Sequence, residues 1–232
     1  MSNSVSEDVP VNDLVSCIMV TKGIEAHLEV AVRCYMNQTY RPRELVVVHQ
    51  GLSDRAERMV TEAGALLVPV PDAEVPLGML RNMGVEAAHG HYVAQWDDDD
   101  WHHPERLNRQ IEVLQASGYQ GCLLTRWYIH DKTAGRMYES FKRNEGWEGS
   151  LVAERLAVAR VRYAPMSKGE DTQMQSRFSK MFKTAYLNEP RLCVYTYHGQ
   201  NTFDARHFRF LIAGSHQLSS EETMEVLRRM TL

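Results

Sequence analysis

Four consecutive aspartates, Asp97 to Asp100, are the residues whose type and spacing most clearly indicate chemistry. Adjacent carboxylates repel one another unless a cation neutralises them. A set of oxygen ligands favours a hard ion such as Mg²⁺ or Mn²⁺, which is often shared with a phosphate. The alternative is a solvated acidic turn that precedes a helix at Pro104. The cluster alone supports the two interpretations about equally.

Two further groups could do chemistry. Glu170 and Asp171, in the sequence Gly-Glu-Asp-Thr, could supply a general base for a hydroxyl, or they could stabilise the positive end of a helix. His198 could complete a metal site, although a lone histidine is more often structural. The remaining histidine-rich stretches lack the thiols or paired spacing of a zinc site, and we interpret them as turn and helix-start residues.

The elements that must position these side chains alternate between apolar runs and helical patterns. Unalternating runs rich in β-branched residues predict strands that are buried on both faces, as in a parallel sheet. Helical spacing separates the runs, and this order is typical of a doubly wound α/β sheet, which binds ligands beyond the carboxyl ends of its strands. The four predicted strands are residues 14–20, 44–49, 65–70 and 91–96. The aspartates follow the last of them.

The second half of the chain is less regular. We predict a helix from Pro104 to Gly118 and a loop over residues 146–150. A helix starts near Asp171, and a C-terminal helix begins with Ser219 and Glu222 at capping-box spacing. The predicted strands are Cys122–Ile129, with a pairing partner at Arg136–Phe141, and Arg191–Tyr197.

Composition restricts the class of protein. The 232 residues include 26 basic and 30 acidic side chains, and this net charge of −4 argues against binding to nucleic acid by bulk charge. We expect the four cysteines to be buried free thiols. The N-terminus lacks a signal pattern and no apolar run could span a membrane, so we expect a cytoplasmic protein, with peripheral membrane association still open. A phosphate-binding P-loop, a dinucleotide fingerprint and a hydrolase elbow are all absent from the sequence.

Taken together, the motifs resemble those of the family 2 glycosyltransferases, which have the GT-A fold. The resemblance covers about residues 14–202 and follows the order of the family's motifs. It rests on a first strand that ends in Thr21, on the segment Asn37–Pro42, on Leu77-Gly78 with Arg81-Asn82-Met83-Gly84, on residues 91–101 with Pro104, on residues 169–172, and on His198 with Asn201.

The resemblance implies one GT-A domain, with a Rossmann-like, mostly parallel sheet flanked by helices and a smaller mixed acceptor half. About residues 11–118 would bind a nucleotide sugar. About residues 119–202 would form the acceptor and catalytic half, and about residues 203–232 would be C-terminal helices.

The resemblance also implies roles for individual residues in an inverting, metal-dependent hexosyltransferase. Asp171 would be the base that deprotonates the acceptor hydroxyl. Asp99 and His198 would hold Mn²⁺ or Mg²⁺. Trp147, Glu148 and Glu170 are weaker candidates for binding the acceptor. The residues implied to bind the nucleotide-sugar donor are Thr21, Gln50, Arg81, Asn82, Asp97 and Asp98.

One position departs from the family pattern. Where the family often has paired aspartates after the second strand, this chain has His49-Gln50-Gly51. The amide of Gln50 could pair with uracil, but it could also fit another base. Of these possibilities, we expect a UDP-linked donor.

The acceptor could be a surface polysaccharide, a lipid-linked sugar or a protein. The alternatives are a nucleotide-sugar-binding module without catalysis and a nucleotidyltransferase of similar topology.

Overall fold

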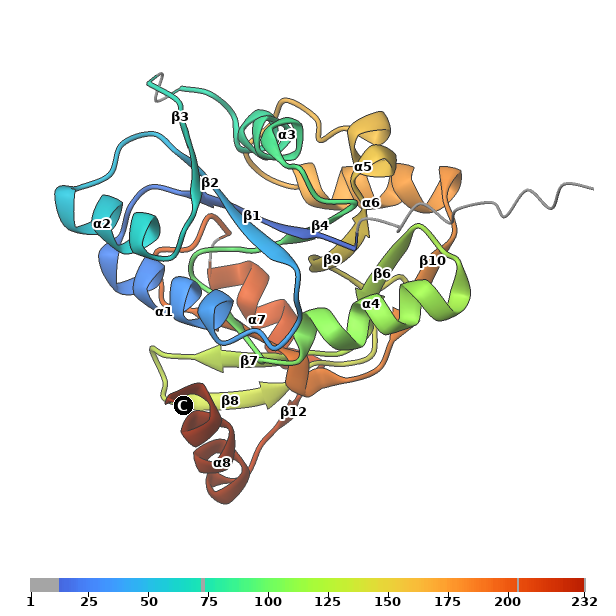
Figure 1. Cartoon of the computed structure of the whole chain (residues 1–232). Coiled ribbons are helices and arrows are strands. Elements are labelled where there is room, and N and C mark those ends of the chain that lie inside the picture. Colours follow the sequence, from blue (N-terminus) through green and yellow to red (C-terminus); the bar gives the residue numbers. More distant parts are fainter. Residues whose placement is uncertain (1–12, 72–73, 204, 232) are drawn as a thin grey trace, which may run out of the picture.

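The structure is a computed structural model that describes residues 13–71, 74–203 and 205–231. The chain forms two β-sheets, and helices cover the larger one on both faces (Figure 1). The larger sheet has the strand order β10-β6-β9-β4-β1-β2-β3. Its strands are β1 (Val15–Thr21), β2 (Arg43–His49), β3 (Leu66–Pro69), β4 (Tyr92–Gln95), β6 (Gly121–Leu124), β9 (Trp147–Glu154) and β10 (Thr184–Leu187).

This sheet is parallel except for β9, which runs antiparallel to both β4 and β6. The predicted first four strands are confirmed, and the central strands β1 and β2 are buried on both faces. Successive residues of β1 enter different layers of the core, because Cys17 and Met19 face one set of helices and Ile18 faces the other.

The helices divide accordingly. One face packs against α1 (Glu25–Met36), α2 (Asp54–Glu62) and α4 (Arg106–Ser117). The opposite face packs against α3 (Leu77–Ala87), α5 (Arg155–Val161) and α6 (Glu170–Met181).

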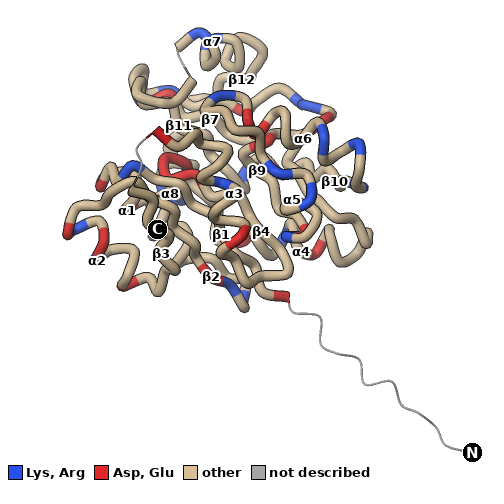
Figure 2. Tube along the Cα trace, turned by 90° about the horizontal axis from the view of Figure 1, so that it is seen from above, with Lys and Arg blue, Asp and Glu red and all other residues tan. Residues whose placement is uncertain are grey.

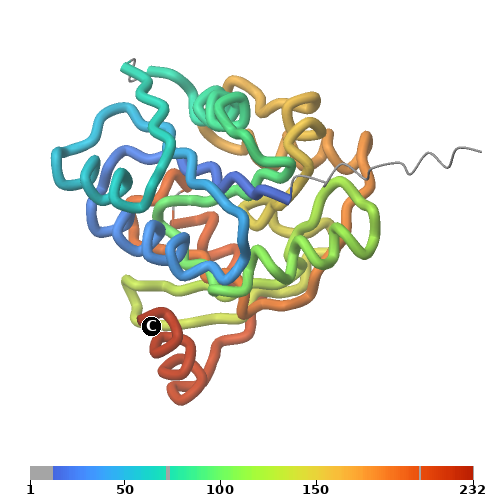
Figure 3. Tube along the Cα trace, viewed as in Figure 1, coloured from blue at the N-terminus to red at the C-terminus, as the bar shows by residue number. Residues whose placement is uncertain are grey.

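The smaller sheet has the order β12-β8-β7-β11-β5, and its strands come from residues 101–217, which run from green to red along the trace in Figure 3. Its strands are β5 (Trp101–His102), β7 (Tyr128–Asp131), β8 (Arg136–Glu139), β11 (Cys193–Tyr197) and β12 (His216–Gln217), with the 3₁₀ turn Pro190–Leu192 before β11. Strand β11 joins the aspartate loop to this sheet, because it pairs antiparallel with β5 and parallel with β7. The last two helices are α7 (Ala205–Ala213) and α8 (Ser220–Thr231).

Two predictions for the second half were wrong. The single strand expected at Cys122–Ile129 is two strands, since the chain leaves the large sheet after Leu124 and enters the small sheet at Tyr128. Most of the loop expected at residues 146–150 is the start of β9, which begins at Trp147 in the middle of the large sheet. Its glycine and serine fit a strand there because a Cβ on Gly149 would lie 2.6 Å from the Trp147 ring. The Ser150 hydroxyl accepts the Leu124 N–H at the irregular register of β6 and β9.

Several local predictions are confirmed. Gly118 ends α4 in the left-handed conformation, as expected from its place at the end of the predicted helix. Ser219 and Glu222 form the reciprocal bonds of a capping box. All four cysteines are free and buried. In the part of the chain that the structure describes, no helix has the length and apolarity needed to cross a membrane.

Candidate active site

The carboxyl ends of the central parallel strands bring the predicted donor residues to one edge of the sheet. In the register of the sheet, Thr21 at the end of β1 lies opposite His49 at the end of β2, and Ile18 lies opposite Gln95 at the end of β4. The Thr21 hydroxyl donates to the Asp98 carboxylate over 2.5 Å, so the first strand and the aspartate loop are in direct contact. This proximity follows from the parallel topology.

Three of the four aspartates have different partners. Asp97 forms an ion pair with Arg81 at 2.9 Å and also accepts from Gln95 at 3.1 Å. Asp98 contacts Thr21, and its pKa is raised to about 7, because burial and the neighbouring Asp99 both disfavour the charged form. Asp99 contacts residues that follow β11.

The fourth aspartate points into the protein. Asp100 is 1% exposed and accepts the backbone N–H of Thr196 at 2.9 Å. Burial raises the pKa of its carboxyl well above the ordinary value, and Asp99 and Asp97 raise it further. Asp100 therefore fastens the aspartate loop to β11 and does not face a ligand. The sequence could not distinguish it from its three neighbours.

Arg81 connects the aspartate loop to the second predicted motif. This guanidinium is 6% exposed and bonds both Asp97 and, at 3.2 Å, Glu170. Burial alone would lower its pKa, but the two carboxylates raise it above the ordinary value. The close packing of α3 places it there, since a Cβ on Gly78 would lie 1.9 Å from the Ala164 carbonyl oxygen.

The two acidic residues at the start of α6 differ in their surroundings. Glu170 is 2% exposed and is held by Arg81, whereas Asp171 is half-buried and bonds only the N–H and hydroxyl of Thr172 among the described contacts. Burial and the nearby Glu170 raise the pKa of Asp171 to about 6, although Arg81 opposes this change. A carboxylate with this pKa is ionised at neutral pH and is more basic than usual, as a general base requires.

His198 and Asn201 surround the outer side of Asp99. The His198 Nε2 lies 3.1 Å from the Asp99 carboxylate, and the Asn201 amide donates to that carboxylate at 3.1 Å. Asn201 also donates to the Thr196 carbonyl and accepts the His198 N–H, so it fixes the turn after β11. On α1, the His27 ring packs 4.2 Å from the His198 ring, a contact that sequence spacing could not indicate.

The Asp99–His198 pair offers one carboxylate and one imidazole to a cation. The described His, Cys, Asp and Glu side chains form no group of three or more that could hold a metal ion. A cation that keeps waters and shares substrate phosphates needs only one or two protein ligands, so this pair fits Mg²⁺ or Mn²⁺ bound together with a diphosphate.

The other predicted residues lie close to this site but have protein partners. Both polar ends of the Asn82 amide bond the backbone of Tyr163, at 2.9 Å each, which ties α3 to the loop before α6. Trp147 is buried, and its ring stacks on Trp127 and packs at a tilt against Tyr195. Glu148 is buried, and its two carboxylate oxygens accept hydrogen bonds from the two terminal nitrogens of the Arg143 guanidinium at 3.2 Å each. Their roles toward a donor or an acceptor stay predictions, as does the base contact of Gln50, which is half-buried just after β2.

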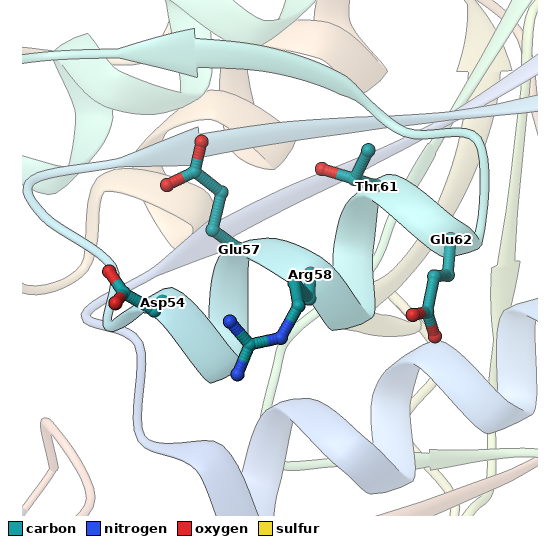
Figure 4. A pocket seen from close by; sticks show the side chains of 5 residues that line it. All are labelled: Asp54, Glu57, Arg58, Thr61 and Glu62. Atoms are coloured by element: carbon teal, nitrogen blue, oxygen red, sulfur yellow. The ribbon is translucent and has the colours of Figure 1, made fainter.

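A hollow of about 350 Å³ lies along α2 (Figure 4). The side chains around it project from a single helix, and none belongs to the predicted site. Its lining is charged and polar, which is typical of a solvated helix face. The lining residues are Asp54, Glu57, Arg58, Thr61 and Glu62.

Solved structures of similar fold include proteins in complex with nucleotide sugars. S. aureus TarS 1-349 in complex with UDP-GlcNAc aligns with a TM-score of 0.68 and 14% identity, covering 93% of this chain and 65% of that one. The mannosyltransferase PcManGT from Pyrobaculum calidifontis, in complex with GDP-Man and Mn²⁺, aligns with a TM-score of 0.64 and 15% identity, covering 86% and 60%. The predicted GT-A fold is therefore confirmed.

Sequence comparison defines the family. An uncharacterised glycosyltransferase of Haemophilus influenzae is 24% identical over 160 residues, which are 66% of this chain and 49% of that protein. The chain thus spans about half the length of this relative. The family model "Glycosyl transferase family 2" matches residues 16–191. The chain belongs to glycosyl transferase family 2.

Proposed function

We propose that this chain transfers a sugar from a nucleoside-diphosphate donor to an acceptor hydroxyl with inversion, using a divalent cation and Asp171 as the general base. The observation that carries the proposal is the double ion pair of Arg81. Through this side chain, the aspartate loop at the end of β4 and the Glu170-Asp171 motif of α6 form one connected site.

The aspartate loop would bind the donor. In this proposal Asp97 and Asp98 face the nucleoside, with Asp98 contacting the ribose and Thr21 holding the Asp98 carboxylate in place. Arg81 lies beside this region and carries a permanent positive charge that favours a diphosphate. Asn82 acts indirectly, because its amide secures the loop that precedes α6.

Asp99 and His198 would hold the cation. A divalent cation bound there would neutralise the negative charge that develops on the leaving nucleoside diphosphate. Asn201 orients both ligands through its bonds to Asp99 and to the backbone of His198. The complex of PcManGT with GDP-Man and Mn²⁺, in a protein of the same fold, supports this assignment.

Asp171 would take the acceptor's proton. A carboxylate oxygen of Asp171 must lie close to the acceptor hydroxyl. The hydroxyl oxygen attacks the anomeric carbon from the side opposite the diphosphate, and attack from that side inverts the configuration. Glu170 suits the role of base less well, because its ion pair with Arg81 stabilises the ionised form and uses one of its oxygens.

The donor base and the acceptor are less closely specified. Gln50 is the candidate for reading uracil, and the UDP-GlcNAc complex of TarS supports a UDP-linked donor, whereas the GDP-Man complex of PcManGT supports a guanine nucleotide. We favour UDP. The acceptor is a carbohydrate, a lipid-linked sugar or a protein. A role in the biosynthesis of a polysaccharide would supply an acceptor of this kind.

A panel of nucleotide sugars tests the proposal against its two alternatives. We expect one donor, with Mn²⁺ or Mg²⁺, to raise the melting temperature and to release free nucleoside diphosphate when an acceptor is present. A nucleotidyltransferase would instead join a sugar 1-phosphate to a nucleoside triphosphate and release pyrophosphate. A non-catalytic module would show the thermal shift without any turnover.

A further inference from the structure

The segment of residues 155–183, which includes α5 and α6, has a charge opposite to that of the whole chain. It carries seven basic and two acidic residues, whereas the whole chain carries 26 and 30. The two acidic residues, Glu170 and Asp171, belong to the candidate active site. Figure 2 shows Lys and Arg gathered along α5, α6 and the start of β10. Six of the seven basic side chains are exposed: Arg160, Arg162, Lys168, Arg177, Lys180 and Lys183.

These helices bury one side and leave the other to solvent. Val158 of α5 and Phe178 of α6 belong to the same apolar core layer, against the large sheet. The Arg177 guanidinium donates to the Arg162 carbonyl, which holds the two helices together on their outer side. Among the residues that the structure describes, only Arg162 of the six exposed basic residues has an ion-pair partner, Glu86 at 2.8 Å. The charge of this surface is therefore largely uncompensated.

Large apolar side chains are exposed between the basic ones. Leu156 is 71% exposed and lies one helical turn before Arg160. Met181 is 51% exposed and lies between Lys180 and Lys183. Leu156 and Met181 are among the large apolar side chains that the described structure leaves more than half exposed, and both lie beside basic residues. Basic residues interleaved with exposed apolar residues are the combination by which proteins bind the interface of an anionic membrane.

We propose that the α5–α6 surface, defined by Leu156, Arg160, Arg177, Lys180, Met181 and Lys183, binds a membrane rich in anionic lipids. The basic side chains attract the lipid headgroups, and Leu156 and Met181 enter the interface. A soluble polyanion would use the same charges but would leave the two apolar side chains exposed to water, so the membrane accounts for more of the surface. Because α6 begins with Glu170 and Asp171, binding on this side holds the candidate active site close to the membrane.

Sedimentation with large unilamellar vesicles tests this proposal without donor, metal or acceptor, so its outcome is separate from that of glycosyl transfer. We expect binding to vesicles of phosphatidylcholine mixed with phosphatidylglycerol and little binding to phosphatidylcholine alone. Each basic residue near an anionic surface contributes about fivefold to binding, so Lys180→Glu with Lys183→Glu should weaken it by at least about 25-fold. Leu156→Ser should weaken it as well.

The matched control reverses two exposed charges on the opposite face of the sheet, Arg33→Glu on α1 with Arg58→Glu on α2. This variant has the same net charge as the double lysine variant and should bind nearly as well as the native protein. Equal losses in the two double variants would overturn the proposal. Unchanged binding of Leu156→Ser would also overturn it, as would binding of free dextran sulfate without any binding of anionic vesicles.

Discussion

Replacing Arg81 with methionine should destabilise the protein far more than replacing an exposed arginine, because Arg81 compensates two carboxylates at once. Arg81 bonds Asp97 at 2.9 Å and Glu170 at 3.2 Å, and Glu170 is 2% exposed. Methionine preserves most of the length of the side chain but removes its charge and its donors. Glu170 would then be a buried carboxylate without its partner.

Removing one partner of a buried ion pair costs about 3–5 kcal/mol, because the remaining charge stays desolvated. For a chain of this size, each kcal/mol lowers the melting temperature by about 2–4 °C. We therefore expect the free energy of unfolding of Arg81→Met to fall by about 3–5 kcal/mol and its melting temperature by roughly 6–20 °C. Urea unfolding should show a lower midpoint with an unchanged slope.

Arg55→Met is the matched control. Arg55 is 64% exposed and pairs with Glu25 at 3.5 Å, so its loss should cost only about 0–1 kcal/mol. The double variant Arg81→Met with Glu170→Gln should regain part of the stability, because it removes the uncompensated charge. Equal losses for Arg81→Met and Arg55→Met would refute the reasoning, as would a double variant less stable than Arg81→Met alone.

Three further predictions concern the site. Because burial raises the pKa of Asp171 to about 6 and only the ionised base accepts a proton, kcat/KM should rise with pH to a plateau above about 6; a flat profile between pH 5 and 8 would contradict this. Gln50→Ala should weaken UDP binding, measured by calorimetry, by about 1–3 kcal/mol, and unchanged affinity would exclude Gln50 as the base-reading residue. EDTA should abolish transfer, and added Mn²⁺ or Mg²⁺ should restore it. Asp99→Ala should remain folded but bind nucleoside diphosphate far more weakly, and full turnover in EDTA would disprove the metal assignment.

The sequence was most informative for structural features that depend on a single helix or strand. The unalternating run at Leu45–Val48 indicated a strand buried on both faces, and the parallel arrangement then placed Thr21 and the aspartates at one edge. Capping patterns such as Ser219 with Glu222 also determine local structure, because their hydrogen bonds form within one turn. These features depend on neighbours close in sequence or on a general rule of topology.

Features that depend on distant partners could not be predicted in this way. Gly149 and Ser150 have the composition of a loop, yet they lie in a central strand because Trp147 needs the space of a missing Cβ and Leu124 needs a hydrogen-bond acceptor. The four aspartates are identical in type, so the inward position of Asp100 depends on the Thr196 N–H, 96 residues away. The motif pattern places Asn82 beside Arg81, but it could not show the bonds of the Asn82 amide to the Tyr163 backbone.

The most direct test of the proposed mechanism is the rate of glycosyl transfer by Asp171→Asn, measured together with donor affinity. Asparagine keeps the oxygen that accepts the Thr172 N–H but cannot take a proton from the acceptor. Asp54→Asn, a substitution of another acidic residue in the first turn of a helix, controls for a loss of helix stability. We predict that Asp171→Asn stays folded, binds the donor with native affinity and transfers sugar about 10²–10⁴-fold more slowly, while Asp54→Asn is unaffected. Near-native transfer by Asp171→Asn would contradict the account.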